Sequence, residues 1–253
     1  MMLCKSGKES DILKYHLKYL GNQKFDGCRC LAICDEQVRL IGRNDGNYTS
    51  KFSEIVNDLK GLKCVLDGEI CCDTFEHTLS RNHTENRLKI KLLEKEYPAI
   101  FYVFDILSLN GEDLTQKPLI ERIRALQGLS GLHNSIVLVK YTPDLINLWE
   151  MAKKENWEGI IIKNPLGRYE GKRSWNWLKI KYIKSRDLLV KNYDINPAGI
   201  RVEEKGIACQ IAGTNGQIVK KIIDETGSCL IEVNYLNETK SGLLRQPTFK
   251  CIK

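Results

Sequence analysis

Residues 24–29 have the sequence KFDGCR and lie where a short helical segment gives way to the first strand-like run. An aspartate and a tight glycine turn next to Lys24 can hold its side chain in one orientation. Nearby cations and partial burial lower the pKa of a lysine, so that its neutral amine can act as a nucleophile. K-x-D-G by itself is more typical of a surface turn, so the interpretation depends on the rest of the chain.

Two further stretches place charged side chains beside apolar strand residues. In EGIIIK, Glu158 and Lys163 frame three isoleucines. A carboxylate and an ammonium so placed can hold a divalent metal and a phosphate close together, although an ordinary core strand with charged ends is the alternative. In WLKIK, strand alternation puts Lys179 and Lys181 on one face. Two neighbouring ammonium groups repel unless an anion lies between them, which favours a phosphate site.

The positive charge of the chain is concentrated around these lysines. The sequence carries 39 Lys and Arg against 32 Asp and Glu, a net charge of +7. Residues 163–191 hold nine of the cations and two acidic residues, which accounts for the whole excess, and four aromatic residues are interleaved with them. Such a segment is typical of contact with the phosphates of a nucleotide or a nucleic acid, although a charge run alone is more often a solvated face.

The spacing of apolar residues predicts an α+β protein in two parts. The predicted helices are 10–20, 51–60, a segment around 81–97, 117–130 and 142–156. Short strand-like runs lie between them, and 63–72 is interpreted as two strands about an Asp-Gly turn. The C-terminal part of the chain contains several short strands and a helix only at 219–225, which suits a small β-barrel. We place the domain boundary near 184–188 and assign 1–185 and 186–253 to two domains.

The ten cysteines do not resemble a disulfide framework, because they are scattered and no C-x-x-C pair occurs. A zinc site formed by Cys28, Cys30 and Cys34 is disfavoured by their spacing. No apolar run approaches the roughly 20 residues that cross a bilayer, and the N-terminus lacks a signal-peptide pattern. We therefore expect a cytoplasmic, reducing environment in which most cysteines are small buried hydrophobes.

Six motifs in order resemble the motif series of the ATP-dependent DNA ligases, within the lysine-nucleotidyltransferase superfamily that also contains RNA ligases and mRNA-capping enzymes. They are KFDGCR at 24–29, RND at 43–45, LDGEI at 66–70, FYVFDI at 101–106, EGIIIK at 158–163 and WLKIK at 177–181. The resemblance covers about residues 20–183 and continues more loosely to the C-terminus. RNDGNYTSKFSEI and GRYEGKRSWNWLKIK are especially similar to cellular ligases, including the ligase modules of prokaryotic end joining.

The resemblance implies a fold and a reaction. The fold would be an α+β nucleotidyltransferase domain (ATP-grasp-like, antiparallel sheets with flanking helices) followed by a small all-β OB-fold domain. Lys24 would attack the α-phosphate of ATP, release pyrophosphate and carry AMP as a phosphoramidate. AMP would then pass to a 5′-phosphate, and a 3′-hydroxyl would displace it and seal the strand. Asp26 would assist the later steps.

The remaining roles also follow from the resemblance. Arg29 and Arg43 would bind phosphate, the latter the 5′-phosphate of the nick. Glu69 would hold the ribose and share a catalytic Mg²⁺ or Mn²⁺ with Glu158, and Phe104 would stack on adenine. The lysines expected around the AMP phosphate are Lys163, Lys179 and Lys181. The physical chemistry agrees, because phosphoryl transfer mainly requires positioning, cations and a metal.

The two ends of the chain depart from the larger family members. Lys24 lies close to the start of the sequence, so we expect no N-terminal DNA-binding domain and no nicotinamide-recognition domain, and ATP is the implied cofactor. SGLLRQPTFKCIK at 241–253 resembles the last family motif, which orients pyrophosphate, with Arg245 and Lys250 as candidates. The polar segment 73–90 is either an insert that grips DNA or, as favoured from its composition, a plain surface loop.

We therefore expect a monomeric enzyme that acts on nicked double-stranded DNA, with an end-binding or clamp protein as a further partner and no membrane contact. Two alternatives stay open: a ligase that accepts RNA ends, and a non-catalytic nucleic-acid-binding relic of the fold. The combination of Lys24, Glu158, Lys179 and Lys181 argues against the relic, because a binding module has no need of a nucleophile beside a metal carboxylate. The pathway is not specified by the sequence.

Overall fold

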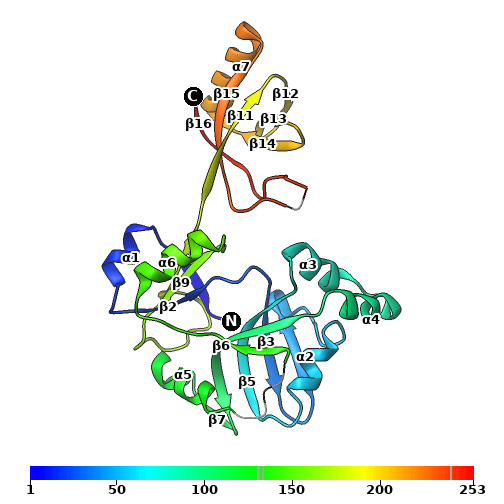
Figure 1. The fold of residues 1–253 in the computed structure, drawn as a ribbon, viewed down its shortest axis with the longest axis vertical. Coiled ribbons are helices and arrows are strands. Elements are labelled where there is room, and N and C mark those ends of the chain that lie inside the picture. Colours follow the sequence, from blue (N-terminus) through cyan, green and yellow to red (C-terminus); the bar gives the residue numbers. More distant parts are fainter. Residues whose placement is uncertain (130–131, 133, 240) are drawn as a thin grey trace. The chain divides into compact units, whose positions relative to one another are not determined.

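The computed structural model describes residues 1–129, 132, 134–239 and 241–253. The chain divides into two compact units, Met1–Ile180 and Lys181–Lys253 (Figure 1). The boundary of 185/186 expected from the sequence falls inside strand β11 (Lys184–Val190). Within the described part of the chain, no helix is both long and apolar enough to cross a membrane.

The larger unit contains a six-stranded sheet in the order β4-β3-β5-β6-β7, with β8 paired to β6. The strands are β3 (Cys28–Cys34), β4 (Val38–Gly42), β5 (Cys64–Cys71), β6 (Ile100–Leu109), β7 (Glu112–Asp113) and β8 (Ile136–Leu138). Every pairing is antiparallel except that of β8 with β6. Alternate residues of β3 are buried, as expected for a strand with one face on the core. All ten cysteines are free and most are buried, as expected.

The prediction of two strands about a turn at 63–72 is wrong, because β5 runs without a break through Asp67 and Gly68. Gly68 is needed for a close contact between strands. A Cβ added there would lie 2.6 Å from the carbonyl oxygen of Tyr102 and 2.5 Å from the Phe101 ring. An Asp-Gly pair therefore marks a site of close backbone approach here rather than a turn.

A second sheet of the larger unit has the order β1-β10-β9-β2. Its strands are β1 (Leu3–Ser6), β2 (Leu20–Gln23), β9 (Gly159–Lys163) and β10 (Arg173–Lys181). β1 pairs with β10 in parallel, which joins the N-terminus to the last strand of this sheet in chain order. β2 pairs with β9 antiparallel. This sheet brings three of the sequence motifs to one place.

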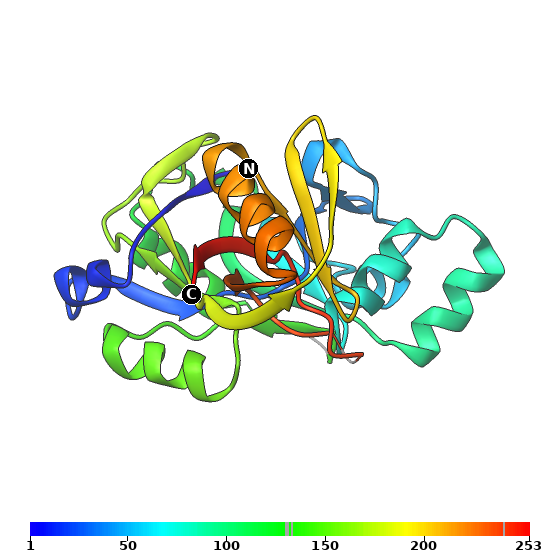
Figure 2. The same cartoon turned by 90° about the horizontal axis from the view of Figure 1, so that it is seen from above.

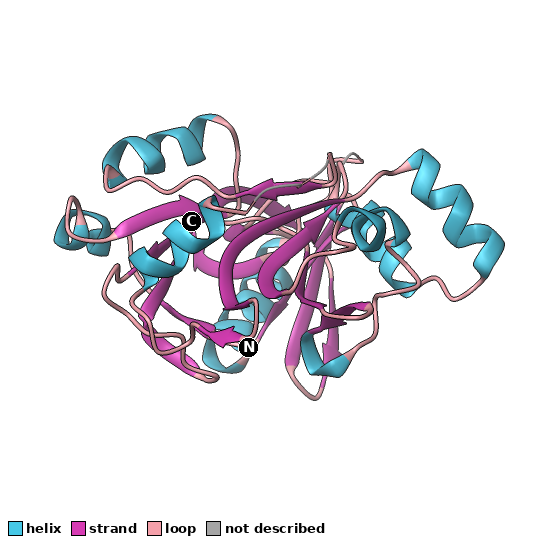
Figure 3. Ribbon diagram, turned by 90° about the horizontal axis from the view of Figure 1, so that it is seen from below, coloured by secondary structure: helices cyan, strands magenta, loops and turns pink. Residues whose placement is uncertain are grey.

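The helices of this unit lie around the two sheets (Figure 3). They are α1 (Ser10–Tyr15), α2 (Ser53–Asp58), α3 (Phe75–His83), α4 (Arg87–Glu96), α5 (Leu119–Gln127) and α6 (Leu145–Lys154), with a 3₁₀ turn, η1, at Arg43–Asp45. The plain loop favoured for 73–90 is wrong, since α3 and the start of α4 occupy most of that segment. The Thr74 hydroxyl caps α3 and the Asn86 side chain caps α4, so short polar residues that suggested a loop serve as N-caps.

The smaller unit is not purely β. It contains β11, β12 (Tyr193–Asn196), β13 (Gly199–Glu204), β14 (Ile207–Ile211), α7 (Gly213–Thr226), β15 (Cys229–Tyr235) and β16 (Thr248–Ile252). The sequence predicted only half of α7, because Gly213 and Gly216 weaken the helical pattern of its first turn. Its two three-stranded sheets, β11-β15-β16 and β12-β13-β14, share one apolar core with α7. α7 (orange) lies against β13 (Figure 2).

Candidate active site

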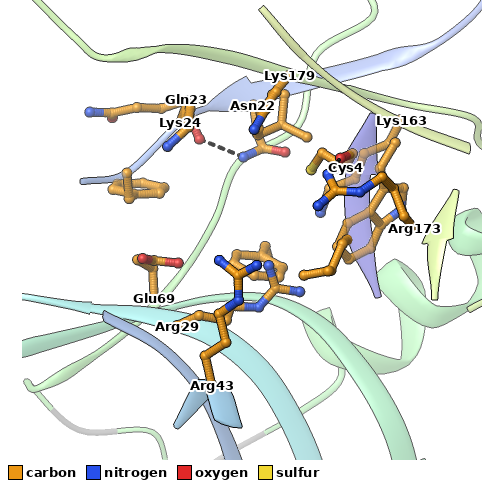
Figure 4. A pocket seen from close by; sticks show the side chains of 15 residues that line it. Cys4, Asn22, Gln23, Lys24, Arg29, Arg43, Glu69, Lys163, Arg173 and Lys179 are labelled. Carbon is orange, nitrogen blue, oxygen red and sulfur yellow. Dashed lines mark hydrogen bonds between the residues drawn. The ribbon is translucent and has the colours of Figure 1, made fainter. Parts of the chain in front are cut away.

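A cavity of about 210 Å³ lies between the two sheets of the larger unit and contains most of the residues that the sequence singled out (Figure 4). Strands β1, β2, β9 and β10 supply one wall, and β3, β5 and β6 supply the other. Its lining includes Lys24, Arg29, Arg43, Glu69, Phe104, Lys163 and Lys179. Residues that are far apart in the sequence therefore meet in one pocket.

Lys24 follows the last residue of β2 and is held at both its backbone and its side chain. Its backbone N–H donates to the carbonyl oxygen of Gly159 at 3.0 Å, which ties it to the start of β9. Its Nζ donates to the carboxylate of Glu158, a side chain only 7% exposed. The lysine and the metal-binding candidate predicted from the sequence are thus direct partners.

The loop after Lys24 is fixed by two close contacts with the larger sheet. Phe25 stacks on Tyr102, with ring centres 4.1 Å apart. A Cβ added to Gly27 would overlap the carbonyl oxygen of Ile70 and lie 2.5 Å from Cys71 Sγ, so only glycine lets the loop pass this close to β5. Asp26, in the same loop, lines an adjacent cavity.

Arg29 is fixed by a carboxylate that the sequence did not single out. Its Nε and Nη2 donate to Asp67 Oδ1 and Oδ2 at 2.5 and 2.7 Å. Tyr169 Oη also donates to Asp67 Oδ2 at 2.7 Å and accepts the backbone N–H of Met2 at 2.9 Å. Arg29 Nη2 in turn donates to the carbonyl oxygen of Met2 at 3.3 Å. This buried ring of hydrogen bonds joins the N-terminal residues to both walls of the pocket.

Glu69 lies two residues after Asp67 on β5 and directly opposite Arg29 in the register of β3 and β5. Burial raises the pKa of Glu69 to about 7, which the positive charges of Arg29 and Lys24 partly offset and the negative charges of Asp67 and Glu158 reinforce. Its carboxyl group therefore exchanges a proton near neutral pH, and a bound cation would favour the carboxylate form.

Lys163 lies in the wall of the pocket, and its ammonium group is buried among aromatic rings. Its Nζ donates to Tyr141 Oη at 2.7 Å and lies 4.0 Å and 4.4 Å from the ring centres of Trp177 and Phe104. Burial lowers the pKa of Lys163 to about 7, against the opposing effect of the Asp105 carboxylate. The ring of Phe104 is 6% exposed and also contacts the guanidinium of Arg29, 4.4 Å from its centre.

The sequence missed a buried acceptor in the pocket. Asn22 is 2% exposed, and its Nδ2 donates to the carbonyl oxygen of Gln23 at 2.6 Å. Its Oδ1 is buried with no hydrogen-bond partner among the described residues. An unpaired buried acceptor is costly, so this oxygen is placed to accept a hydrogen bond from a ligand. Asn22 lies two residues before Lys24, but nothing in the residue types marked it.

Four further residues of the site were not singled out from the sequence, although three of them belong to the quoted motifs. Asp67 belongs to LDGEI, and Tyr169 and Arg173 belong to GRYEGKRSWNWLKIK, so their motifs were a usable signal. Cys4 lines the pocket beside Arg173, whose Nη1 donates to the carbonyl oxygen of Cys4 at 2.6 Å. Cys4 had no signal, because it reaches the site only through the pairing of β1 with β10.

Four predicted site residues do not line this cavity. Glu158 accepts the hydrogen bond from Lys24 without lining the cavity itself, and Asp26 lines the adjacent one. The other two belong to the smaller unit. Lys181 is the last residue of β10 and belongs to the smaller unit. Arg245 belongs to that unit as well, where its backbone pairs with Leu236 and Asn237. Lys250, the other candidate of the last motif, forms an ion pair with Glu232 at 2.9 Å.

Comparison with known proteins gives consistent similarities. A family profile described as "ATP dependent DNA ligase domain" matches residues 1–181. The SPbeta prophage-derived DNA ligase-like protein LigB of Bacillus subtilis is 28% identical, over 92% of each chain. The bifunctional non-homologous end joining protein LigD of the same organism is 29% identical over 87% of this chain, which spans 40% of that relative. A solved structure of a Lig E DNA ligase has a TM-score of 0.72 at 17% identity, covering 100% of this chain and 99% of its own.

Proposed function

The chain belongs to the family of ATP-dependent DNA ligases, and we propose that it seals nicks by way of AMP bound covalently to Lys24. The contact of Lys24 Nζ with the Glu158 carboxylate, at a pocket lined by cations, carries this assignment. An amine held at a pocket lined with cations has the position that a nucleophile toward a phosphate requires.

The first step forms a bond between Lys24 Nζ and the α-phosphorus of ATP and breaks the bond to the pyrophosphate oxygen. The attacking amine gives up its proton, and pyrophosphate leaves. A 5′-phosphate oxygen of the nick then attacks the AMP phosphorus and returns the electron pair to Nζ, which regains a proton. Attack by the 3′-hydroxyl on the 5′-phosphorus expels AMP and closes the strand.

The carboxylates of Glu69 in the pocket and Glu158 beside it suit a divalent metal that is held jointly with substrate phosphates. Among the described residues there is no group of three or more His, Cys, Asp or Glu side chains arranged to hold a metal alone. Mg²⁺ commonly binds one or two carboxylates together with nucleotide phosphates, which Glu158 and Glu69 could supply. A bound metal would neutralise charge on the phosphoryl oxygens.

Side chains around the pocket suit the other parts of a nucleotide. The unpaired Oδ1 of Asn22 can accept a hydrogen bond from an exocyclic amino group such as that of adenine. We assign to Phe104 the aromatic surface for the base, to Glu69 the ribose, and to Lys179, Lys163 and Arg43 the phosphates. Asp67 and Tyr169 act as positioning residues that orient Arg29.

We further infer that Lys181–Lys253 is an OB-fold domain, and that Lys181 and Arg245 are the two predicted site residues that belong to it. β11 and β12 are separated by only two residues and pair with β15 and β13 respectively, as one bent strand would. Counted in this way, the unit has the five strands of that fold, with α7 between the third and the fourth. Shared apolar packing of both sheets supports this assignment.

The test is incubation with α-labelled ATP and Mg²⁺, denaturing electrophoresis, and a chase with nicked duplex DNA. We expect label on the wild-type protein that moves to DNA and yields a sealed strand. Lys24→Ala and Lys24→Arg should both take up no label, because a guanidinium keeps the charge but not the nucleophile. Covalent AMP on either variant would reject Lys24 as the nucleophile.

The chase also separates DNA from RNA ends. Nicks with a 3′-deoxy or a 3′-ribo terminus are offered in parallel to the labelled protein. Sealing of the deoxy nick at the higher rate is expected, and label that moves only to RNA ends would assign the enzyme to the RNA ligases instead.

A further inference from the structure

Helix α4 is firmly attached to the larger unit by its inner face. Ile90 and Leu93 are buried against the protein. Glu94 Oε2 accepts a hydrogen bond from Ser53 Oγ of α2 at 2.5 Å, and Asn86 caps the helix through the backbone N–H groups of its first turn. The position of α4 is therefore fixed by contacts on one side only.

The outer face of α4 carries two exposed leucines bordered by lysines. Leu88 and Leu92 are 75% and 66% exposed. Successive helical residues turn by about 100°, which puts Lys91 and Lys95 on one side of these leucines and Lys89 on the other. Exposed leucines on neighbouring turns at the centre of a basic face indicate a surface that meets a partner.

The cations of this face form no ion pairs within the described part of the protein. Four basic residues of α4 form no ion pair with any described residue, namely Arg87, Lys89, Lys91 and Lys95. Of the acidic residues nearby, Glu85 pairs with Lys51, whereas Glu94 and Glu96 accept hydrogen bonds from the Ser53 and Tyr97 hydroxyls and keep their charge. Helix α4 therefore carries four cations against two carboxylates. On α7, by contrast, lysines pair with acids one turn away.

The insertion that contains α4 begins and ends at the pocket strands. β5 carries Glu69 and ends at Cys71, after which α3 and α4 follow. The chain then returns through β6, which carries Phe104. A duplex whose nick reaches this pocket extends on both sides of it, and α4 is about 15 Å long, comparable with about four to five base pairs.

We propose that α4 holds the duplex flanking the nick, with Leu88 and Leu92 entering the minor groove and the lysines contacting the two phosphate strands that border it. The minor groove is about 6 Å wide, too narrow for a helix but not for side chains, and apolar wedges bordered by cations suit it. Across the helix, the two leucines lie between lysines on either side. Across the DNA, the minor groove lies between two phosphate strands, so the two arrangements match. The proposal rests on DNA as the substrate in the proposed function.

The charge component is tested with Lys89→Gln/Lys91→Gln, which keeps helix-forming residues on α4. Fluorescence anisotropy with a nicked, 5′-phosphorylated duplex gives Kd between about 50 and 200 mM salt, where such contacts dominate binding. The slope of log Kd against log salt should fall by about 1.8, or about 0.9 for each lost phosphate contact. The matched control Lys18→Gln/Lys154→Gln, with exposed lysines around α1 and α6, should leave the slope unchanged.

The apolar component is tested with Leu88→Ala/Leu92→Ala. Loss of the two leucine side chains from the minor groove should weaken binding about tenfold without changing the salt slope. Leu13→Ala, a leucine 73% exposed on α1, is the control and should bind as the wild type does. Self-adenylylation by ATP alone should be normal in all four variants, which shows that each one is folded.

The outcomes separate this proposal from the proposed function. A wild type that neither takes up AMP nor seals nicks would reject the function, whereas the anisotropy series would still report on α4. Wild-type Kd and salt slope in both α4 variants would overturn the proposal and assign the leucines to a protein partner or a second copy. Loss of self-adenylylation in a folded α4 variant would also overturn it, because no DNA is present in that assay.

Discussion

At the scale of single residues, the pocket contains ionisable groups whose burial disfavours their charged form. Lys163 is 1% exposed, with aromatic rings and one hydroxyl around its ammonium. Its pKa of about 7 follows from that burial. The neutral amine still donates to Tyr141, whose Oη in turn donates to the carbonyl oxygen of Phe104 at 2.5 Å. A chain of hydrogen bonds therefore connects Lys163 to the backbone of the strand that carries Phe104.

This lysine should make the stability of the larger unit depend on pH. The unfolded chain keeps the lysine protonated up to a pKa near 10.5, whereas the folded state releases the proton near 7. The unfolded state then binds more protons between these values, so the free energy of unfolding rises with pH in that window. Lys163→Met should remove a slope of about 1.4 kcal/mol per pH unit between about pH 7.5 and 9.5.

Tryptophan fluorescence during urea unfolding measures this effect selectively. All four tryptophans, at 149, 157, 175 and 177, lie in the larger unit. Parallel curves of unfolding free energy against pH for wild type and Lys163→Met would show that the side chain is charged in the folded protein.

At the scale of elements, the pocket depends on how closely the loop after β2 approaches β5. The loop carries Lys24, and Gly27 lies against the backbone of Ile70. Strand β9 holds the other side of the loop through the hydrogen bond from Lys24 to Gly159. A shift at Gly27 would therefore move Lys24 relative to both sheets.

Gly27→Ala should reduce the rate of self-adenylylation at least about tenfold, because the new methyl group meets backbone atoms that cannot move aside. The rate of label uptake from ATP is the measurement. Gly171→Ala is the control, since a Cβ there has nothing within 4 Å, and its rate should equal that of the wild type. An unimpaired Gly27→Ala enzyme would mean that the loop adapts without displacing Lys24.

At the scale of the whole molecule, the two units divide the proposed chemistry. Most candidate residues line one cavity of the larger unit, and Arg245 lies in the smaller one. Removing 242–253 would delete β16, which pairs with β15 and contributes Phe249 and Ile252 to the core of the smaller unit. A point substitution therefore tests the last motif better than a truncation does.

Arg245→Ala should lower the rate of self-adenylylation about a hundredfold if the guanidinium stabilises the leaving pyrophosphate. Sealing of a pre-adenylylated nick should stay close to the wild-type rate, because no pyrophosphate leaves in that step. Arg201→Ala, an exposed arginine on β13, is the control for both assays. Equal losses in the two assays would reject a role limited to pyrophosphate.

The sequence by itself determined the chemical groups of the site and their family. A lysine near an aspartate and a glycine, two lysines on one strand face and a carboxylate before an apolar strand are local patterns, and strand alternation is enough to interpret them. Four of the predicted helices are likewise local consequences of apolar spacing. The burial of most cysteines was expected from their scattered positions and small apolar side chains. The same local rules failed at Gly68, because an Asp-Gly pair has the same appearance in a turn and at a close strand contact.

Only the tertiary structure decided which of these groups meet and in what state. The pairing of β1 with β10 brings Cys4 and Met2 to the pocket from the far end of the chain, and no local pattern specifies a partner so distant in the sequence. The pKa values of Lys163 and Glu69 depend on burial by several strands at once. That the Asn22 oxygen is unpaired and that the leucines of α4 are exposed depends on what surrounds these side chains and not on their residue type. Sequence determines which side chains are available, but long-range packing sets their distances, solvation and charge.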